Sequence, residues 1–130
     1  MCQMLLSIKP QFVASILSGQ KKYEYRKFRC REDVDKIVIY STAPVKRVVA
    51  EVDIIEIVED SVEVVWKKTK EHSGISKDFF DHYYEGKKRA FAYHLGEMHV
   101  YDKPKLLQEI GVSYPPQSFC YLASGGADKI

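Results

Sequence analysis

Hydrophobic and polar positions divide the first third of the chain into three short elements. The apolar residues at positions 5, 6 and 8 predict a first strand. Apolar residues then recur at helical spacing over residues 10–18, a segment that begins with a proline and ends before a glycine. From Lys22 the pattern becomes extended, and a period of two places Glu24 and Arg26 on one face, opposite two tyrosines.

The remaining two thirds of the chain also alternate between strand and helix patterns. Asp60, with a glutamate three residues later, resembles a capping box, so a helix is expected after it; Gly74 ends this helix and Ser76 caps a second one. A further helical turn is expected within residues 105–110. The apolar runs predict strands over residues 37–40, 48–58, 90–95 and 117–122.

Short strands interrupted by a few short helices predict an α+β, mainly β fold. We expect a small closed or partly closed β-barrel with the helices packed around it, because closure removes exposed strand edges. A length of 130 residues fits one domain. We expect this domain over residues 1–122, followed by a flexible tail over residues 123–130, which is rich in small residues.

Composition and motifs exclude several classes of protein. No apolar run has the length of a membrane span, and the N-terminus lacks the pattern of a signal peptide. The three cysteines are widely spaced and form no disulfide framework, so a cytoplasmic protein is expected. The four histidines match no metal-binding spacing and the Gly-rich phosphate loop is missing, so no metal and no cofactor are expected.

The charge is unevenly distributed, although its net value is only +2. Residues 21–31 contain six basic residues and one acidic residue, whereas residues 50–63 contain six acidic residues and no basic one. Such a local positive excess suits an anionic ligand. The alternative is a basic strand that faces water.

Four residues of the basic segment stand in a recognisable spacing. Gly19, Lys21, Glu24 and Arg26 form the pattern GxKxxExR, which resembles the signature of the ASCH domain, a branch of the PUA-like superfamily. Segments 7–10, 40–44 and 115–119 also resemble this family, so that the similarity spans residues 4–122. The resemblance implies a PUA-like β-barrel with a cleft beside the signature. It also implies binding of RNA or of a modified nucleoside, with a role in RNA-linked regulation such as transcription regulation.

The same resemblance implies an enzymatic alternative. Small bacterial members of the family hydrolyse N4-acetylcytidine and others are described as ribonucleases, in both cases as metal-independent hydrolases. Lys21 matches the lysine of the amidohydrolase members, and Glu71 is the match for their later glutamate. Glu24 stands where those members have a threonine, so a threonine nucleophile is not available at that position. The catalytic set that the resemblance implies is therefore Lys21, Glu24 and Glu71, and binding ranks before hydrolysis because the threonine is missing.

Each charged residue of the signature has two possible chemical roles. Lys21 pairs with a phosphate, or acts as a base if its pKa is lowered; Glu24 beside it is expected to keep it charged, which favours binding. Arg26 offers a planar fork to a phosphate or a base edge, or simply pairs with Glu24. Other ligand-binding candidates have structural alternatives as well: turn capping, core packing or plain exposure. These candidates are Lys9, Tyr40, Ser41, Thr42, Gln117, Ser118 and Phe119. The expected partner is thus RNA or a nucleoside, with no membrane, and the oligomeric state stays open.

Overall fold

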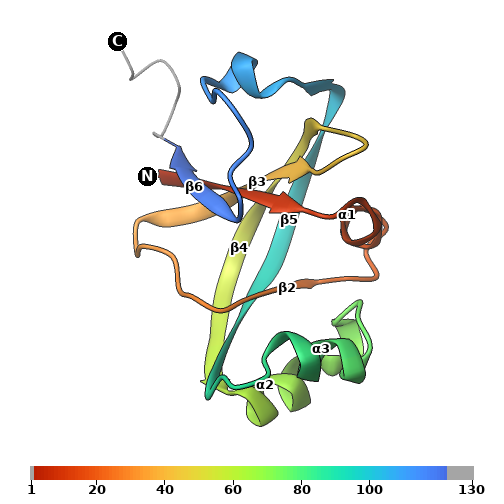
Figure 1. Ribbon diagram of the computed structural model, residues 1–130, viewed down its shortest axis with the longest axis vertical. Helices are drawn as coiled ribbons and strands as arrows, with labels where there is room; N and C mark the ends of the chain where they lie inside the picture. The colour runs from red at the N-terminus through yellow and green to blue at the C-terminus, as the bar shows by residue number, and fades with distance from the viewer. Residues whose placement is uncertain (1, 123–130) are drawn as a thin grey trace.

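The computed structural model describes residues 2–122 of the chain (Figure 1). Its strands are β1 (Cys2–Ile8), β2 (Tyr23–Arg26), β3 (Val34–Ser41), β4 (Arg47–Ser61), β5 (Arg89–Lys105) and β6 (Phe119–Leu122). Its helices are α1 (Pro10–Leu17), α2 (Val62–Thr69) and α3 (Lys77–Tyr83), with 3-10 turns η1 (Lys70–His72) and η2 (Leu107–Ile110). No helix within this part of the chain is both long and apolar enough to span a membrane. The predicted tail, residues 123–130, lies outside the described residues.

The six strands form one mixed sheet in the order β2-β5-β4-β3-β1-β6. β1 and β3 are parallel, and the other neighbours are antiparallel. The longest pair, β4 and β5, runs through the length of the molecule, and its register shifts at three places, which bend the sheet (Figure 1). β2 and β6 are the two edges, and within residues 2–122 the sheet does not pair them, so the expected barrel is not confirmed.

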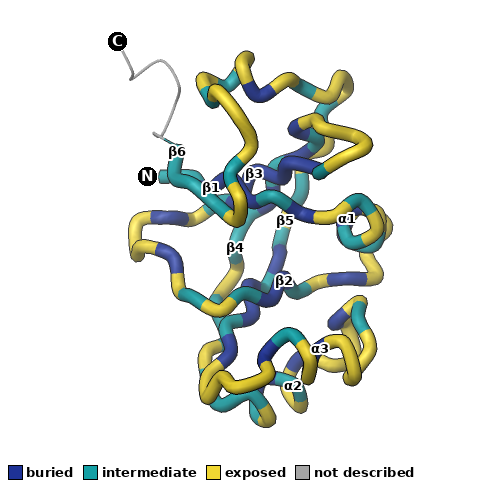
Figure 2. The backbone as a smooth tube through the Cα atoms, viewed as in Figure 1, coloured by how far each residue is buried: buried dark blue, intermediate teal, exposed yellow. Residues whose placement is uncertain are grey.

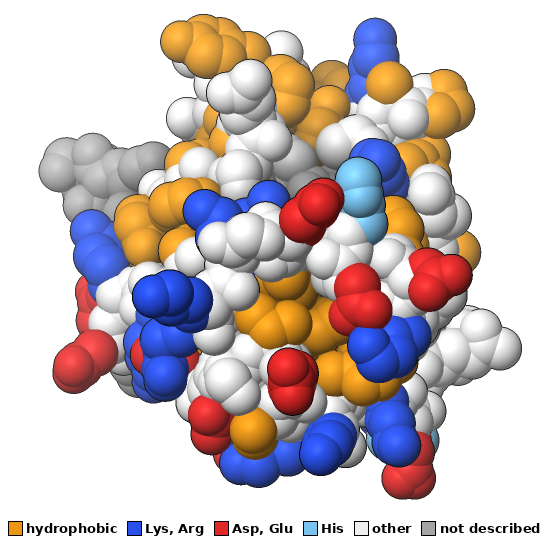
Figure 3. Space-filling view, turned by 60° about the horizontal axis from the view of Figure 1, so that its bottom comes forward, with side chains coloured by type: hydrophobic (Ala, Val, Ile, Leu, Met, Phe, Trp, Pro, Cys, Tyr) orange, Lys and Arg blue, Asp and Glu red, His pale blue; other side chains and the backbone are white. Residues whose placement is uncertain are grey.

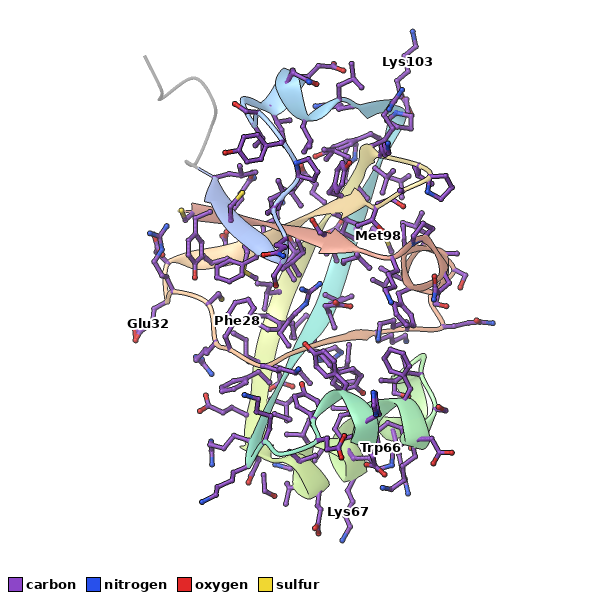
Figure 4. The ribbon with its side chains drawn as sticks, in the orientation of Figure 1. Phe28, Glu32, Trp66, Lys67, Met98 and Lys103 are labelled. Carbon is purple, nitrogen blue, oxygen red and sulfur yellow. The ribbon has the colours of Figure 1, made fainter. Side chains whose placement is uncertain are left out.

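Side chains, and not backbone hydrogen bonds, bridge the gap between the two edges. Arg26 of β2 donates from Nη2 to the carbonyl of Ser7, at 3.1 Å, and from Nη1 to Oγ of Ser118, at 3.2 Å. Phe28, labelled in Figure 4, stacks on Phe119 with ring centroids 4.2 Å apart. An α+β sheet curved so that its edges meet through side chains is therefore the observed architecture.

Most of the predicted elements are present, with two differences. The strand expected over residues 90–95 extends to Lys105, because β4 offers pairing partners as far as Val48. The cap of α2 is Ser61, whose Oγ accepts from the backbone of Val64, and not Asp60 as expected. Asp60 instead accepts a hydrogen bond from the backbone of Ser61, at 2.7 Å.

The core separates into clusters that fix the position of β2 (Figure 2). One cluster packs α2 and α3 against the ends of β2 and β5, and Phe80 and Tyr84 lie at its centre; Trp66 of α2 packs on Phe80 (Figure 4). The hydroxyl of Tyr84 donates to the carbonyl of Arg26, at 2.7 Å. The α2–α3 segment is therefore attached directly to the strand that carries the signature.

Candidate functional site

A cavity of about 220 Å³ lies where β2, the β1–α1 junction and the segment around α3 meet. Four of the predicted site residues line it together: Lys9, Lys21, Glu24 and Arg26. Their convergence follows from the fold, because Lys9 immediately precedes α1 and Lys21 lies just before β2, which contains the other two. Its remaining lining residues are Ser7, Ile8, Phe12, Tyr25, Ile75, Phe79 and Tyr83.

Lys21 is a buried lysine with 3% of its surface exposed. Its Nζ donates to the carbonyl of Ser73, at 2.8 Å, and lies 4.8 Å from the centre of the Tyr25 ring. The backbone N–H of Lys22 donates to the carbonyl of His72, at 2.9 Å, and so also joins the start of β2 to the segment after α2. One carbonyl accepts only one of the three protons of an ammonium group, so the other donors are available to a ligand.

The close approach of residues 70–76 to Lys21 depends on Gly74. This glycine has φ +71, and a Cβ there would lie 2.5 Å from Cβ of Lys21 and 2.6 Å from its Cγ. A side chain at position 74 would therefore collide with the stem of Lys21 as well as strain the backbone.

Burial is the main influence on the pKa of Lys21. It lowers the pKa below the ordinary 10.5; Glu24 raises it, and Arg26 lowers it further. Glu24 acts in the expected direction, towards the charged form of Lys21, but burial outweighs it. Glu24 is also paired with Arg26, whose own charge lowers the pKa of Lys21.

Glu24 and Arg26 form the ion pair that their spacing on one strand face predicts. Nε and Nη2 of Arg26 both donate to Oε2 of Glu24, at 3.1 and 2.9 Å, and the two side chains are only 11% and 10% exposed. Within the described residues Oε1 of Glu24 accepts no hydrogen bond, and it is not a fully buried unpaired atom. The pair is therefore structural and also leaves one carboxylate oxygen for a ligand.

Tyr25 supports Lys21 from β2 itself. The hydroxyl of Thr69 donates to the carbonyl of Val65, at 2.8 Å, so the hydroxyl of Tyr25, 2.7 Å away, donates to Thr69. Burial raises the pKa of Tyr25 to about 12, and the Thr69 contact offsets part of that rise. The alternation predicted Tyr25 on the face opposite Glu24, yet its ring lines the same cavity.

Lys21 also lines a second, wider cavity of about 430 Å³, together with Lys22, His94 and Glu97. His94 stacks on Tyr23, which does not line this cavity, with ring centroids 4.7 Å apart. Nδ1 of His94 is the buried side-chain atom without a hydrogen-bond partner among the described residues. This cavity lacks Glu24, Arg26 and the aromatic rings of α3, so the smaller one is the better candidate site.

The structure does not bring the other predicted site residues into the 220 Å³ cavity. Tyr40 and Ser41 are buried in β3, and Tyr40 packs in the core with Leu5 and Val48. Ser118 and Phe119 contact the site indirectly, through Arg26 and Phe28. Residues placed outside the cavity lining are Tyr40, Ser41, Thr42, Glu71, Gln117, Ser118 and Phe119.

Glu71 is exposed on η1, and its segment reaches the site through the carbonyls of His72 and Ser73 instead.

Sequence reasoning missed several residues of this site. Ser73 contributes a backbone carbonyl, which no side-chain pattern reveals. Phe79 and Tyr83 follow the Ser76 cap and were not among the predicted site residues; they line the cavity, whereas Phe80 and Tyr84 fill the core. The available signal was two pairs of aromatic residues, 79 with 83 and 80 with 84, each pair four residues apart and therefore on its own face of the helix.

Charged side chains of both signs surround apolar ones on the face that Figure 3 turns forward. Among residues 2–122 no group of three or more histidine, cysteine, aspartate or glutamate side chains lies close enough to hold a metal ion. The groups that line the described cavity include two lysines, the Glu24–Arg26 ion pair and aromatic rings.

The fold and the site define a small α+β protein whose cavity is built around a buried lysine and a glutamate–arginine pair. The family model described as the ASCH domain matches residues 6–104, and the chain belongs to the ASCH domain family.

Curated relatives include much longer proteins. The chain is 36% identical over 87 residues to the large ribosomal subunit protein uL22 of Ureaplasma parvum, which covers 67% of this chain and 28% of that protein. It is 30% identical over 120 residues to an ATP synthase subunit alpha of the same species, covering 91% of this chain and 15% of that protein. The chain thus spans less than a third of the length of these two relatives.

A relative of similar length comes from Zymomonas mobilis. It is named an ASCH domain-containing ribonuclease and is 29% identical over 130 residues, covering 97% of this chain and 88% of that protein. The crystal structure of ASCH from Zymomonas mobilis matches with a TM-score of 0.86 and 29% identity, covering 98% of this chain and 92% of that one. A variant of that protein in which a tyrosine is replaced by phenylalanine matches with the same TM-score and 28% identity, covering 98% and 94%.

Proposed function

We propose that this ASCH protein binds single-stranded RNA and places one nucleotide of it, or a free modified nucleoside, in the 220 Å³ cavity. The observation that carries the proposal is the burial of Lys21 beside the Glu24–Arg26 pair in one accessible hollow. Pockets for drug-sized ligands measure roughly 300–1,000 Å³. The smaller volume here suits a single base or nucleoside.

The chemistry of the lining matches a nucleotide. Lys21 and Lys9 supply positive charge, and Oε1 of Glu24 supplies an acceptor for an amino group of a base edge. Phe12, Tyr25, Phe79 and Tyr83 supply aromatic surface. The relative named as a ribonuclease, which aligns over nearly the whole chain, further supports an RNA ligand.

The test compares how the wild type and Lys21→Met bind fluorescently labelled single-stranded RNA. Binding is measured by fluorescence anisotropy at about 50 and about 200 mM salt. Methionine keeps the packed stem and removes the charge. A lost charged hydrogen bond is worth about 1.5–3 kcal/mol, so we expect binding to weaken roughly 10- to 150-fold. Thermal unfolding of both proteins checks that the variant is folded.

The matched control is Lys103→Met, which removes an exposed lysine at the far end of β5 (Figure 4). It is expected to bind RNA like the wild type. Equal affinity of Lys21→Met and wild type at both salt concentrations would show that the cavity is not the binding site. Competition by free modified nucleosides then tests whether a nucleoside alone fills the site.

The lowered pKa of Lys21 favours a second candidate function, metal-independent hydrolysis of RNA. A neutral Lys21 amine would take the proton of a ribose 2′-hydroxyl as its oxygen attacks the phosphorus; the bond to the 5′-oxygen breaks, and Lys21 returns the proton to that oxygen. The products are a 2′,3′-cyclic phosphate and a 5′-hydroxyl. Glu71 has no part in this step because it lies outside the cavity.

The same samples test this second function on gels in the presence of EDTA. We expect cleavage by the wild type that rises with pH as Lys21 loses its proton, and none by Lys21→Met. N4-acetylcytidine, incubated in parallel and followed by chromatography, tests the deacylase alternative. Cleavage that persists in Lys21→Met would contradict a role for this lysine as the base.

A further inference from the structure

Phe79 is an unusually placed aromatic residue, 45% exposed at the cavity while its neighbour Phe80 is fully buried. Phe79 and Tyr83 lie four residues apart on α3 and therefore on one face of the helix. Both line the cavity, whereas Phe80 and Tyr84 pack in the core. Tyr83 also packs partly against that core cluster and contacts Tyr84, so core packing leaves only Phe79 of these four aromatic residues unexplained.

The Phe79 ring is held in place although it is exposed. It makes an edge-to-face contact with Phe12 of α1, with centroids 5.4 Å apart and planes at 70°. This contact joins α1 and α3 across the cavity, and Figure 1 shows these helices on opposite sides of β2. A ring fixed in this way loses little freedom when a ligand packs on it.

Positive charge accompanies the aromatic surface. Lys27, the residue after β2, places its Nζ 4.5 Å from the centre of the Tyr83 ring. Lys9 is exposed and lines the cavity at the start of α1. Aromatic rings flanked by lysines are what single-stranded nucleic acids require, because the rings stack on bases and the lysines meet phosphates.

We propose that Phe79 is a stacking platform for a nucleobase of the bound RNA, at the mouth of the cavity, with Lys27 and Lys9 beside the adjoining phosphates. This inference rests on the proposed function and adds where affinity and selectivity arise. Every base has an aromatic face, so stacking on Phe79 strengthens binding without selecting a sequence. Selection among bases falls to the polar groups deeper in the cavity, Lys21 and Glu24.

The test uses RNA oligonucleotides that carry 2-aminopurine, a fluorescent adenine analogue whose emission is quenched by stacking, at each position in turn. With the wild type we expect quenching at one position. With Phe79→Ala we expect quenching to be lost there and affinity to fall roughly 5- to 150-fold, the range found for stacked bases. Phe79→Trp is expected to restore both, and Phe79→Leu, which keeps the apolar contact with Phe12, is expected to restore neither.

Tyr114→Ala is the matched control, because Tyr114 is 77% exposed and outside this cavity. It is expected to leave affinity and quenching unchanged. If the wild type bound RNA and Phe79→Ala showed the same affinity and the same quenching, the stacking role would be overturned and the proposed function would stand. No binding of any RNA by the wild type would overturn both. An affinity loss that Phe79→Trp shares with Phe79→Leu and Phe79→Ala would overturn the stacking role alone, because the wild type would still bind RNA.

Discussion

Lys21 owes its chemistry to a segment fifty residues away in the sequence. Its Nζ meets the carbonyl of Ser73, and its stem lies against Gly74. Burial by this segment lowers the pKa of Lys21 despite the nearby Glu24 carboxylate. The charge pattern of residues 21–26 predicted the direction of the Glu24 effect but not the net shift, because it does not contain the contacts that remove water from Lys21.

Gly74→Ala tests this close approach at a single residue. An alanine in the left-handed region costs about 1–2 kcal/mol, and at position 74 its Cβ would also meet Lys21 at 2.5 Å. We expect a larger loss of the free energy of unfolding than that backbone cost, measured by urea denaturation.

Gly86→Ala is the control for the Gly74 substitution. Gly86 has φ +80, close to the φ of +71 at Gly74, but a Cβ there would meet no atom within 4 Å. It therefore shares the backbone cost and lacks the collision. Equal losses in the two variants would mean that contact with Lys21 is not what requires Gly74.

The Glu24–Arg26 pair is the part of the site that sequence reasoning predicted best. A period of two in an extended segment places these residues on one face, and the structure joins them through two hydrogen bonds. The prediction worked because it needed only local geometry. It could not extend to Ser73 or Phe79, which belong to other elements and approach β2 through tertiary packing.

At the scale of elements, β2 and the loop after it are held by tyrosine hydroxyls as well as by pairing with β5. β2 has four residues and lies at the edge of the sheet. Tyr93 of β5 donates to the carbonyl of Phe28, at 2.8 Å, and accepts from the backbone of Cys30, at 2.9 Å. One hydroxyl thus satisfies two backbone groups of the loop.

Tyr93→Phe is expected to loosen this loop. Leaving a buried backbone group unpaired costs about 1–3 kcal/mol, and Tyr93 serves two such groups. We expect a loss of roughly 2–4 kcal/mol in the free energy of unfolding and faster amide exchange at Cys30.

Tyr101→Phe provides the comparison for Tyr93. Its hydroxyl donates to the carboxylate of Glu51, at 2.9 Å, and that carboxylate also lies 3.5 Å from Nζ of Lys36. Glu51 therefore keeps a partner, and the loss is expected to be smaller. A Tyr93→Phe variant with normal exchange at Cys30 would show that pairing with β5 suffices to order the loop.

Elements with strong local signals were predictable. α1 has a proline at its start and Gly19 after it, and α3 has the Ser76 cap, whose Oγ accepts from Phe79 at 3.1 Å. β5 was predicted too short because its second half, residues 96–105, is polar and mostly exposed. Its partner β4, and not its own apolar pattern, keeps that half extended.

For the whole molecule, the sequence predicted the class of fold and missed how the sheet ends. The number of short strands and helices predicted an α+β fold, which the structure has. Residues 6–104 also match the family model of the ASCH domain. Whether a sheet closes depends on which strands pair, and β1 pairs both with β3 and, across most of the chain, with β6. Here β2 and β6 stay unpaired to each other and leave a gap that the side chains of Arg26 and Phe28 bridge.

Buried tyrosines connect this architecture to a property of the whole molecule, its stability in alkali. Burial is the largest cause that raises the pKa of Tyr25, Tyr84, Tyr93 and Tyr101 above the ordinary 10.0. The unfolded chain loses these protons near pH 10, whereas the folded protein retains them. Their contribution to stability is therefore complete below pH 10 and is lost as the pH rises through the folded-state values.

Tyr25→Phe isolates one part of this alkaline loss. The pKa of Tyr25 is raised to about 12, so near about pH 11 this residue alone accounts for roughly 1.4 kcal/mol of lost stability, one pKa unit. The lowered pKa of Lys21 has the opposite effect in both proteins, because it makes stability rise with pH up to about pH 10.5. We expect urea denaturation between about pH 8 and 11.5 to give a shallower fall for Tyr25→Phe than for the wild type. Its lower stability at neutral pH, from the lost hydrogen bond to Thr69, leaves this slope unaffected.

Tyr114→Phe, at a 77% exposed position, is the control and is expected to match the wild-type slope. If Tyr25→Phe matched it as well, the phenol of Tyr25 would titrate alike in the folded and unfolded protein, and the wall of the cavity that it forms would be open to water.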